Sequence, residues 1–246
     1  MDLVVDNALV RVRGSLPRDV ARDLRALAKL ELEPPVAGSV YGALLNFKDA
    51  LAALGEAVTQ PPYKAPPRAP VLYLKPRNTH SAHGAGIVVP RGVEALSMGG
   101  TLGVVIGRVA CRVPEGEALS FVAGYTVAND VSVPHDTYYR PSIRYKCLDG
   151  SCPLGPWVVA RRHVANPDDL SLRVYVDGVE RQHASTRDLV RPVAKLLADV
   201  TEFMTLQPGD VLLVGVPANA PLARTGQRVS VSIDGVGTLD NALVAQ

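Results

Sequence analysis

The chain has few cysteines, no long hydrophobic run and almost no net charge. Its three cysteines among 246 residues follow no repeated spacing, so we expect no disulfide framework. No apolar run reaches the ~18 residues that a membrane-spanning helix needs, and Met1–Asp6 lacks the basic-then-apolar order of a secretory signal. A net charge of +2 creates no strong field toward nucleic acid or a membrane surface. These absences predict a cytoplasmic globular protein with neither nucleic-acid nor membrane partners.

Glycine and proline are plentiful, with 21 and 20 residues. Their abundance indicates many short elements joined by turns. Valine recurs in short runs, which favours strands, and the pairs Asp177-Gly178 and Asp234-Gly235 indicate two hairpins. The strands that we expect lie at residues 9–12, 40–44, 71–74, 87–89, 102–107, 121–127 and 211–214.

Helices are few in this pattern. Apolar residues at helical spacing predict helices at 17–30 and 48–58, and a third that Pro192 opens. The apolar face of the third carries Val193, Leu196, Leu197, Val200, Phe203 and Met204. The predicted fold class is therefore α+β and β-rich, with a curled mixed sheet. We expect a small amino-terminal strand–helix segment at residues 1–36 and one larger domain at 37–246.

The densest polar segment runs from residue 128 to residue 149. Arg140, Arg144 and Lys146 lie within seven residues of one another, and in an extended strand their even offsets would place them on one face. Arginine presents a fork that matches carboxylate oxygens, so such a face suits a small ligand with two carboxylates. A solvated basic strand with scattered ion pairs is the alternative. Lys75 directly follows an apolar strand, where sites are often built, although a single lysine there is more often simply exposed.

The sequence lacks the residue patterns that a zinc site, a nucleophilic cysteine or a serine hydrolase needs. His80 and His83 have no third histidine or cysteine nearby, which argues against a zinc site. Cys147 and Cys152 lack the neighbouring histidine that a nucleophilic thiol needs. The chain also has no Gly-x-Ser-x-Gly elbow. Spacing alone therefore predicts a β-rich domain with an acidic small-molecule ligand.

Six motifs, in the expected order, resemble those of the fumarylacetoacetate hydrolase family over residues 40–244. They are Leu45–Asp49, Leu74–Pro76, Leu102–Gly107, Gly124–Asp130, Lys146–Pro156 and Leu206–Gly215. The resemblance implies a mixed β-sandwich roll with few helices. Residues 62–67, 75–79 and 139–141, together with Lys146, are similar to a branch of the family that acts in aromatic catabolism. That branch decarboxylates and isomerises unsaturated seven-carbon keto-dicarboxylates, and some organisms encode its amino-terminal half as a separate subunit.

The chain departs from the family at the groups that hold metal, handle protons and contact substrate. These positions read, respectively, Gly99 and Thr101, Ala50 and Ala53, and Val216. Active members combine a Glu-x-Glu pair with the retained aspartate to bind Mg²⁺ or another divalent ion. One carboxylate cannot hold such an ion at useful affinity, because hard cations need several oxygen ligands. The resemblance thus implies no cofactor in this chain, and Mg²⁺ or Mn²⁺ in a partner subunit.

The retained residues define the candidate site. The resemblance implies catalytic roles for Lys75, Asp130 and Lys146 and substrate-binding roles for Tyr139, Arg140 and Arg144. We expect Lys146 close to Asp130, in a central pocket that binds a small keto-dicarboxylate. The chain is expected to form a homodimer or a hetero-oligomer with a paralogous subunit. Three functions remain open: one subunit of an isomerase/decarboxylase, a self-sufficient metal-free isomerase, or a non-catalytic partner that shapes a hetero-oligomer.

Overall fold

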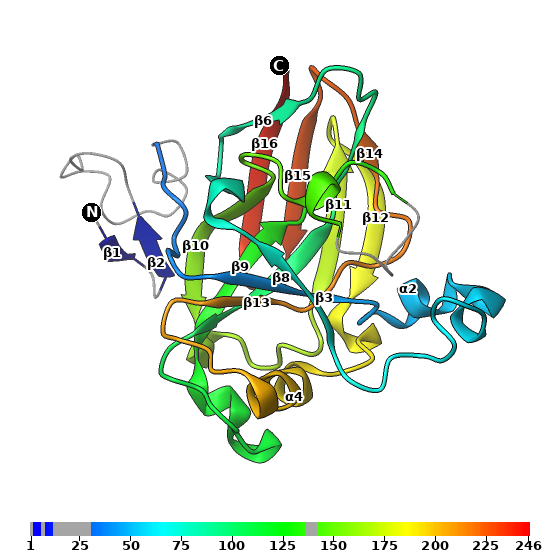
Figure 1. Ribbon diagram of the computed structural model, residues 1–246. Helices are drawn as coiled ribbons and strands as arrows, with labels where there is room; N and C mark the ends of the chain where they lie inside the picture. Colours follow the sequence, from blue (N-terminus) through cyan, green and yellow to red (C-terminus); the bar gives the residue numbers. More distant parts are fainter. Residues whose placement is uncertain (1, 6–7, 12–30, 136–141) are drawn as a thin grey trace.

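Most of the protein is β-sheet, arranged in two large sheets (Figure 1). The computed structural model describes residues 2–5, 8–11, 31–135 and 142–246. The larger sheet has nine strands, ordered β1 (Asp2–Val5), β2 (Ala8–Arg11), β10 (Cys152–Ala160), β9 (Val122–Asn129), β8 (Gly100–Ile106), β13 (Val211–Leu213), β3 (Val40–Leu44) and β4 (Val71–Lys75), with β5 (His80–Ala82) beside β10. Strand-rich mixed sheets with few helices confirm the predicted fold class.

The second sheet has five strands. Their order is β12 (Val179–Ser185), β11 (Ser171–Val176), β15 (Arg228–Ile233), β16 (Gly237–Ala245) and β6 (Gly86–Val89). A small ribbon joins β7 (Leu96–Ser97) to β14 (Leu222–Ala223). Both predicted hairpins are present, because Asp177-Gly178 connects β11 to β12 and Asp234-Gly235 connects β15 to β16. Asp177 and Gly178 both have positive φ, as the tight two-residue turn requires.

The two sheets bury a common core between them. Alternate residues of β11, namely Leu172, Val174 and Val176, are buried, as expected for a strand with one inward face. All seven residues of β8 are buried, because that strand lies in the middle of its sheet. A side chain at Gly100 would come within 2.7 Å of Val174. Glycine at position 100 thus lets the two sheets pack closely at this point.

Helix α4 (Val193–Phe203) covers one end of the sandwich (Figure 1). Leu196, Leu197 and Val200 form its buried stripe and face the 3₁₀ turn at Glu115–Phe121. The prediction placed Phe203 on the same stripe, but its side chain is 62% exposed. Phe203 is the last helical residue.

The remaining described helices are short. Helix α2 (Lys48–Ala52) ends earlier than predicted, because Gly55 has a φ of +51° and starts a separate 3₁₀ turn at Gly55–Thr59. Helix α3 spans Ile143–Lys146, and further 3₁₀ turns lie at Arg77–Thr79, Arg161–His163 and Thr186–Asp188. No helix in the described part of the chain is long and apolar enough to cross a membrane. The helix predicted at 17–30 lies outside the described residues.

The amino-terminal strands extend the larger sheet. Leu9 of β2 lies opposite Val158 of β10, and Val10 is fully buried. The strand predicted at 9–12 is therefore present, one residue earlier, as β2. The division into a 1–36 segment and a 37–246 domain stays a prediction.

Candidate active site

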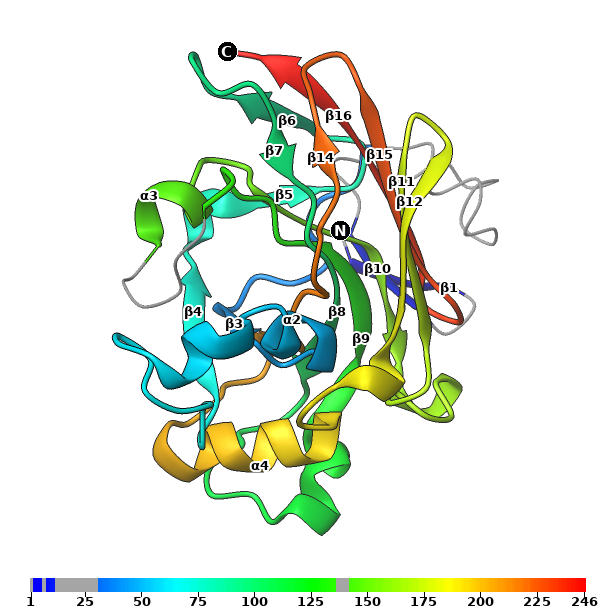
Figure 2. The same cartoon turned by 90° about the vertical axis from the view of Figure 1, so that its right-hand side faces the viewer.

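A cavity of about 460 Å³ lies beside β4, a volume typical of small-molecule sites. Figure 2 shows β4, α2 and α3 on one side of the molecule, and residues of all three line the cavity. The loops after β9 and β13 complete its wall. The cavity therefore gathers segments that are far apart in the sequence, from Ala43 to Leu222.

Strand alternation aims two polar side chains of β4 at the cavity side of the sheet. Tyr73 and Lys75 are two residues apart and so share a face, while Leu74 between them points outward and is 56% exposed. Gly42 on β3 lies opposite Tyr73 in the register. A side chain at that position would come within 2.1 Å of the Tyr73 ring. Glycine at 42 is thus what lets the tyrosine ring lie across the neighbouring strand.

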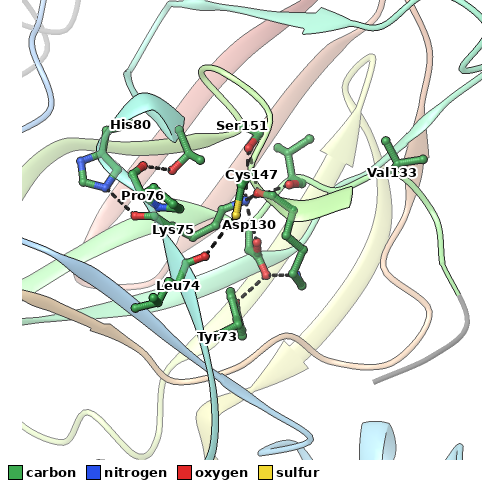
Figure 3. Close-up of polar contacts among 12 residues, drawn as sticks. Tyr73, Leu74, Lys75, Pro76, His80, Asp130, Val133, Cys147 and Ser151 are labelled. Carbon is green, nitrogen blue, oxygen red and sulfur yellow. Dashed lines mark hydrogen bonds and ion pairs between the residues drawn. The ribbon is translucent and has the colours of Figure 1, made fainter. Parts of the chain in front are cut away.

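Asp130, directly after β9, is the centre of a buried ion cluster (Tyr73, Lys75, Asp130 and Lys146). Its Oδ2 accepts hydrogen bonds from Tyr73 Oη and Lys146 Nζ, each at 2.5 Å. Lys75 Nζ lies 3.0 Å from Oδ1. Figure 3 shows the side chains of Tyr73 and Lys75 converging on the Asp130 carboxylate. The predicted proximity of Lys146 to Asp130 is confirmed.

The cluster keeps Asp130 ionised. Burial by itself would raise the pKa of this carboxyl, but the charges of Lys146 and Lys75, with the hydrogen bonds from Lys146 and Tyr73, hold the pKa well below its ordinary value. Burial, reinforced by the Asp130 charge, raises the pKa of Tyr73 well above its usual range, so the phenol keeps its proton. Two ammonium groups and one carboxylate leave one net positive charge. The cluster is consequently suited to an anionic ligand.

Lys75 is a positioning residue within this cluster. Its side chain is fully buried, and its Nζ donates to the backbone carbonyls of Val131 and Lys146 and to Ser151 Oγ. An ammonium has three protons, so these bonds use all of them. Lys75 lies behind the residues that line the cavity. Its structural contribution is to fix the loop after β9 and the end of α3 around Asp130.

Lys146 is the cation that faces the cavity. It ends α3, its side chain is 8% exposed, and its Nζ lies 4.4 Å from the centre of the Tyr73 ring. The expectation that Arg144 and Lys146 share a strand face is wrong, because the segment is helical. Residues two apart on a helix point about 200° from each other, and Arg144 is exposed. Tyr139 and Arg140 lie outside the described residues, so their roles stay predictions.

The positions of the family's metal ligands do not fit a divalent ion. A side chain at Gly99 would come within 2.6 Å of the Asp130 carbonyl oxygen. The Thr101 hydroxyl is buried and donates to the Gly215 carbonyl at 2.5 Å. Asp130 is already paired with two ammonium groups. Among the described residues, no group of three histidine, cysteine or acidic side chains could hold a metal, and one carboxylate is too few for Mg²⁺.

Part of the cavity lining is apolar, and we call this part the alanine wall (Ala50, Ala53 and Val216). Ala50 belongs to α2, Ala53 follows it, and Val216 follows β13. These are the positions at which the family resemblance places a proton-handling pair and a substrate-contacting threonine. The structure therefore brings the replaced positions together on one wall.

Two cavity residues escaped the sequence analysis. Tyr73 could have been found, because it lies two positions before Lys75 on a predicted strand. His135 also lines the cavity, but it stands alone in the sequence and nothing in its spacing marks it. Only the fold shows that it lies near Asp130 and Lys146 at one site.

Comparison with known proteins places this cavity in a family of enzymes. The model of the fumarylacetoacetate (FAA) hydrolase C-terminal domain matches residues 39–244. The chain is 41% identical over 209 residues to the 4-hydroxyphenylacetate degradation bifunctional isomerase/decarboxylase of Salmonella dublin, covering 85% of this chain and 48% of that protein. The chain thus spans about half the length of the curated isomerase/decarboxylases that it matches.

Solved structures share the fold. The 2-hydroxyhepta-2,4-diene-1,7-dioate isomerase from Mycobacterium marinum matches with a TM-score of 0.76 and 28% identity, over 100% of this chain and 97% of that one. Maleylpyruvate hydrolase from Sphingobium sp. SYK-6, solved with manganese (II) and pyruvate, matches with a TM-score of 0.73 and 27% identity, over 89% and 75%. Motifs, fold and a match over residues 39–244 agree, and the chain belongs to the fumarylacetoacetate hydrolase family.

Proposed function

We propose that this chain isomerises an unsaturated seven-carbon 2-hydroxy dicarboxylate to its 2-oxo form, as one subunit of an isomerase/decarboxylase of 4-hydroxyphenylacetate catabolism. The similarity to enzymes with these names supports the reaction class. A paralogous partner is part of the proposal because the positions of the family's metal ligands read Gly99 and Thr101 in this chain. In this proposal the paralogue holds the Mg²⁺ or Mn²⁺ and performs the decarboxylation.

The observation that carries the proposal is the Lys146 ammonium group, held at the cavity by an ionised carboxylate. A cation fixed where negative charge develops stabilises an enolate without reorganising at the moment of reaction. Moving a proton between carbon and oxygen of a dienol requires little beyond this stabilisation of the enolate. Decarboxylation demands stronger electron withdrawal, of the kind that a divalent metal ion would supply. The cluster therefore fits the isomerisation better than the decarboxylation.

Each residue of the ion cluster has a distinct part. Lys146 binds the 2-oxygen and the adjacent carboxylate of the substrate. Asp130 stays ionised, orients the Lys146 Nζ and limits the cluster to one net positive charge. Tyr73 keeps its proton and directs it to Asp130. Lys75 positions Asp130 from behind, rather than contacting the substrate.

Replacement of Lys146 by methionine tests the proposal. A hydrogen bond to a charged group contributes about 1.5–3 kcal/mol, so Lys146→Met should weaken binding of a dicarboxylate analogue about 10- to 100-fold. Isomerase activity should fall at least as far. Lys195→Met is the matched control, because Lys195 is a half-exposed lysine of α4, which lies at the end of the sandwich. Binding is measured by calorimetry and activity by loss of dienol absorbance, for the chain alone and with its metal-binding paralogue.

A non-catalytic partner subunit is the second candidate. The absent metal ligands and the alanine wall favour it, since both remove groups that the family uses for chemistry. In that case Lys146→Met would leave ligand binding unchanged in the chain and activity unchanged in the complex. An effect of Lys146→Met that occurs only in the complex, without any change in ligand binding, would indicate a role in subunit assembly.

A further inference from the structure

We propose that Ser97 and Ser132, which we call the serine pair, bind the second carboxylate of the ligand and so make the cavity selective for dicarboxylates. The inference rests on the proposed function and deepens it, because that function assigns one end of the ligand to Lys146 and leaves the other end without a partner. Both serines line the cavity that Lys146 faces.

The backbone of two segments holds the serine pair together. Ser97 ends β7 and lies opposite Ser132 in an antiparallel bridge. The N–H of each residue donates to the carbonyl oxygen of the other, and the nitrogen–oxygen distances are 2.8 and 3.2 Å. Residues directly opposite each other in an antiparallel pair point to the same face. The two side chains therefore project from one face, next to each other.

A third residue shows that this face is turned toward the cavity. On the other side of β7, Ser97 lies opposite Leu222 of β14, and Figure 2 shows these two short strands side by side. Leu222 also lines the cavity. Leu222 is 53% exposed and Ser132 is 6% exposed. The row of three residues thus leads from the open rim of the cavity to its interior.

Both hydroxyl groups of the serine pair are open to a ligand. Within the described residues, neither Oγ has a hydrogen-bond partner, and neither is sealed off from solvent. The bonds between Ser97 and Ser132 use backbone groups alone. Each hydroxyl group can donate one hydrogen bond. Two such donors next to each other can bind both oxygens of one carboxylate.

The spacing from the ion cluster suits a seven-carbon ligand. Ser132 is two residues after Asp130, so their Cα atoms are at most about 7 Å apart. A seven-carbon dicarboxylate, with carbon–carbon bonds of about 1.5 Å in a zigzag, spans roughly 7–8 Å between its carboxyl carbons. The Lys146 Nζ is held at the Asp130 carboxylate. A ligand with one carboxylate at Lys146 can therefore reach the serine pair with the other.

The rest of the described lining offers few other donors for the second carboxylate. Outside the ion cluster, the polar lining residues are Ser97, Ser132, His135 and Asn219. His135 directs Nδ1 to the Val133 carbonyl, and its Nε2 is buried. Asn219 is exposed, whereas Ser132 is buried and Ser97 partly so. Hydrogen bonds to a charged group are stronger where water is excluded, which favours the serine pair.

Substitution of the serine pair by alanine, singly and together, tests the assignment by binding. The probes are heptanedioate, which has a carboxylate at each end, and heptanoate, which has only one. In calorimetry the wild type should bind heptanedioate at least about tenfold more tightly, because a hydrogen bond to a charged group is worth that factor or more. In Ser97→Ala/Ser132→Ala the preference should fall to within about threefold. Affinity for heptanoate should stay unchanged, since Lys146 still binds its carboxylate.

Ser232→Ala is the matched control, because the Ser232 hydroxyl pairs with Thr238 across two strands at the exposed surface. It should bind both probes as the wild type does. A wild type that binds neither probe, or binds both equally, overturns the inference. A double variant that keeps the preference, or that loses heptanoate binding as well, also overturns it.

The proposed function fails on a different measurement. It is overturned if the wild type, alone and with its paralogue, does not isomerise 2-hydroxyhepta-2,4-diene-1,7-dioate. An active wild type whose double variant keeps the preference for heptanedioate overturns only the assignment of the serine pair.

Discussion

Two parts of the cavity lining differ in their polarity. The ion cluster, on β4, after β9 and on α3, is buried and densely hydrogen-bonded. The alanine wall on α2 and after β13 has no polar side chain. In the proposed function, the ion cluster binds the anionic substrate and the alanine wall supplies no group for proton transfer. Substitutions and titrations can test this division.

Asp130→Asn should destabilise the protein most. Removing the carboxylate leaves the buried ammonium groups of Lys75 and Lys146 without a counter-charge, and breaking a buried ion pair in this way costs about 3–5 kcal/mol. Urea denaturation measures the free energy of unfolding. The matched control is Glu94→Gln, since Glu94 pairs with Arg224 at the exposed surface, and its effect should stay below about 1 kcal/mol. Equal effects of the two substitutions would contradict the central role of the ion cluster.

The ion cluster should also make stability depend on pH in the acidic range. The pKa of Asp130 is lower in the folded chain than its ordinary value near 3.9, so the unfolded chain binds more protons in acid. This stabilisation is complete above the unfolded pKa and is lost as the pH falls below about 4 toward the folded pKa. Urea titrations from pH 6 to pH 3 should show a steeper decline for the wild type than for Asp130→Asn. If stability declined with the same slope in the wild type and in Asp130→Asn, Asp130 would not be the cause of the decline.

Gly42→Ala should have an intermediate effect. The added methyl would meet the Tyr73 ring at 2.1 Å, so the ring must move and its hydrogen bond to Asp130 must lengthen. Overpacking of this kind costs about 1–3 kcal/mol, and ligand affinity should fall with it. Gly116→Ala is the control, because nothing lies within 4 Å of a side chain at that position. A Gly42→Ala variant as stable as Gly116→Ala would show that the ring has room to shift.

Metal ions should have the smallest effect. Calorimetric titration of the chain with Mg²⁺ or Mn²⁺ should show no tight one-to-one binding, because Gly99 and Thr101 provide no carboxylate and Asp130 is paired with lysines. The same titration of the complex with its paralogue should show binding, which locates the metal in the partner. Tight binding to the isolated chain would prove this assignment wrong.

Strands with regular alternation could be predicted from the sequence, and those without it could not. Val40–Leu44 matches β3 residue for residue, and both Asp-Gly hairpins are present. Strand β10 was missed, because Pro153, Gly155 and Pro156 within it are residues that normally interrupt strands. It is nevertheless a long strand between β2 and β9, and its register with β9 shifts between Gly155 and Val159, where Pro156 lies.

The candidate site could be predicted where a side chain follows directly from a motif. Lys75, Asp130 and Lys146 lie together as expected. Arg144 was placed with them on the assumption of an extended chain, and the short helix α3 turns it outward. His135 could not have been placed at the cavity from the sequence, because it stacks on the Tyr145 ring and lines a cavity that other segments form. The residues around position 135 in the sequence carry no information about neighbours that come from other segments of the chain.

The tight contact at Gly99 limits the mutational routes open to this chain. Any side chain there would collide with the main chain at Asp130, 2.6 Å away, so a single codon change to glutamate cannot rebuild a ligand at that position. The backbone of the loop after β9 would first have to retreat, and that loop also holds Asp130 against Lys75 and Lys146. Introducing a metal ligand at position 99 would therefore disturb the ion cluster before the ligand could form. The close backbone contact at Gly99 thus opposes a carboxylate side chain at this position.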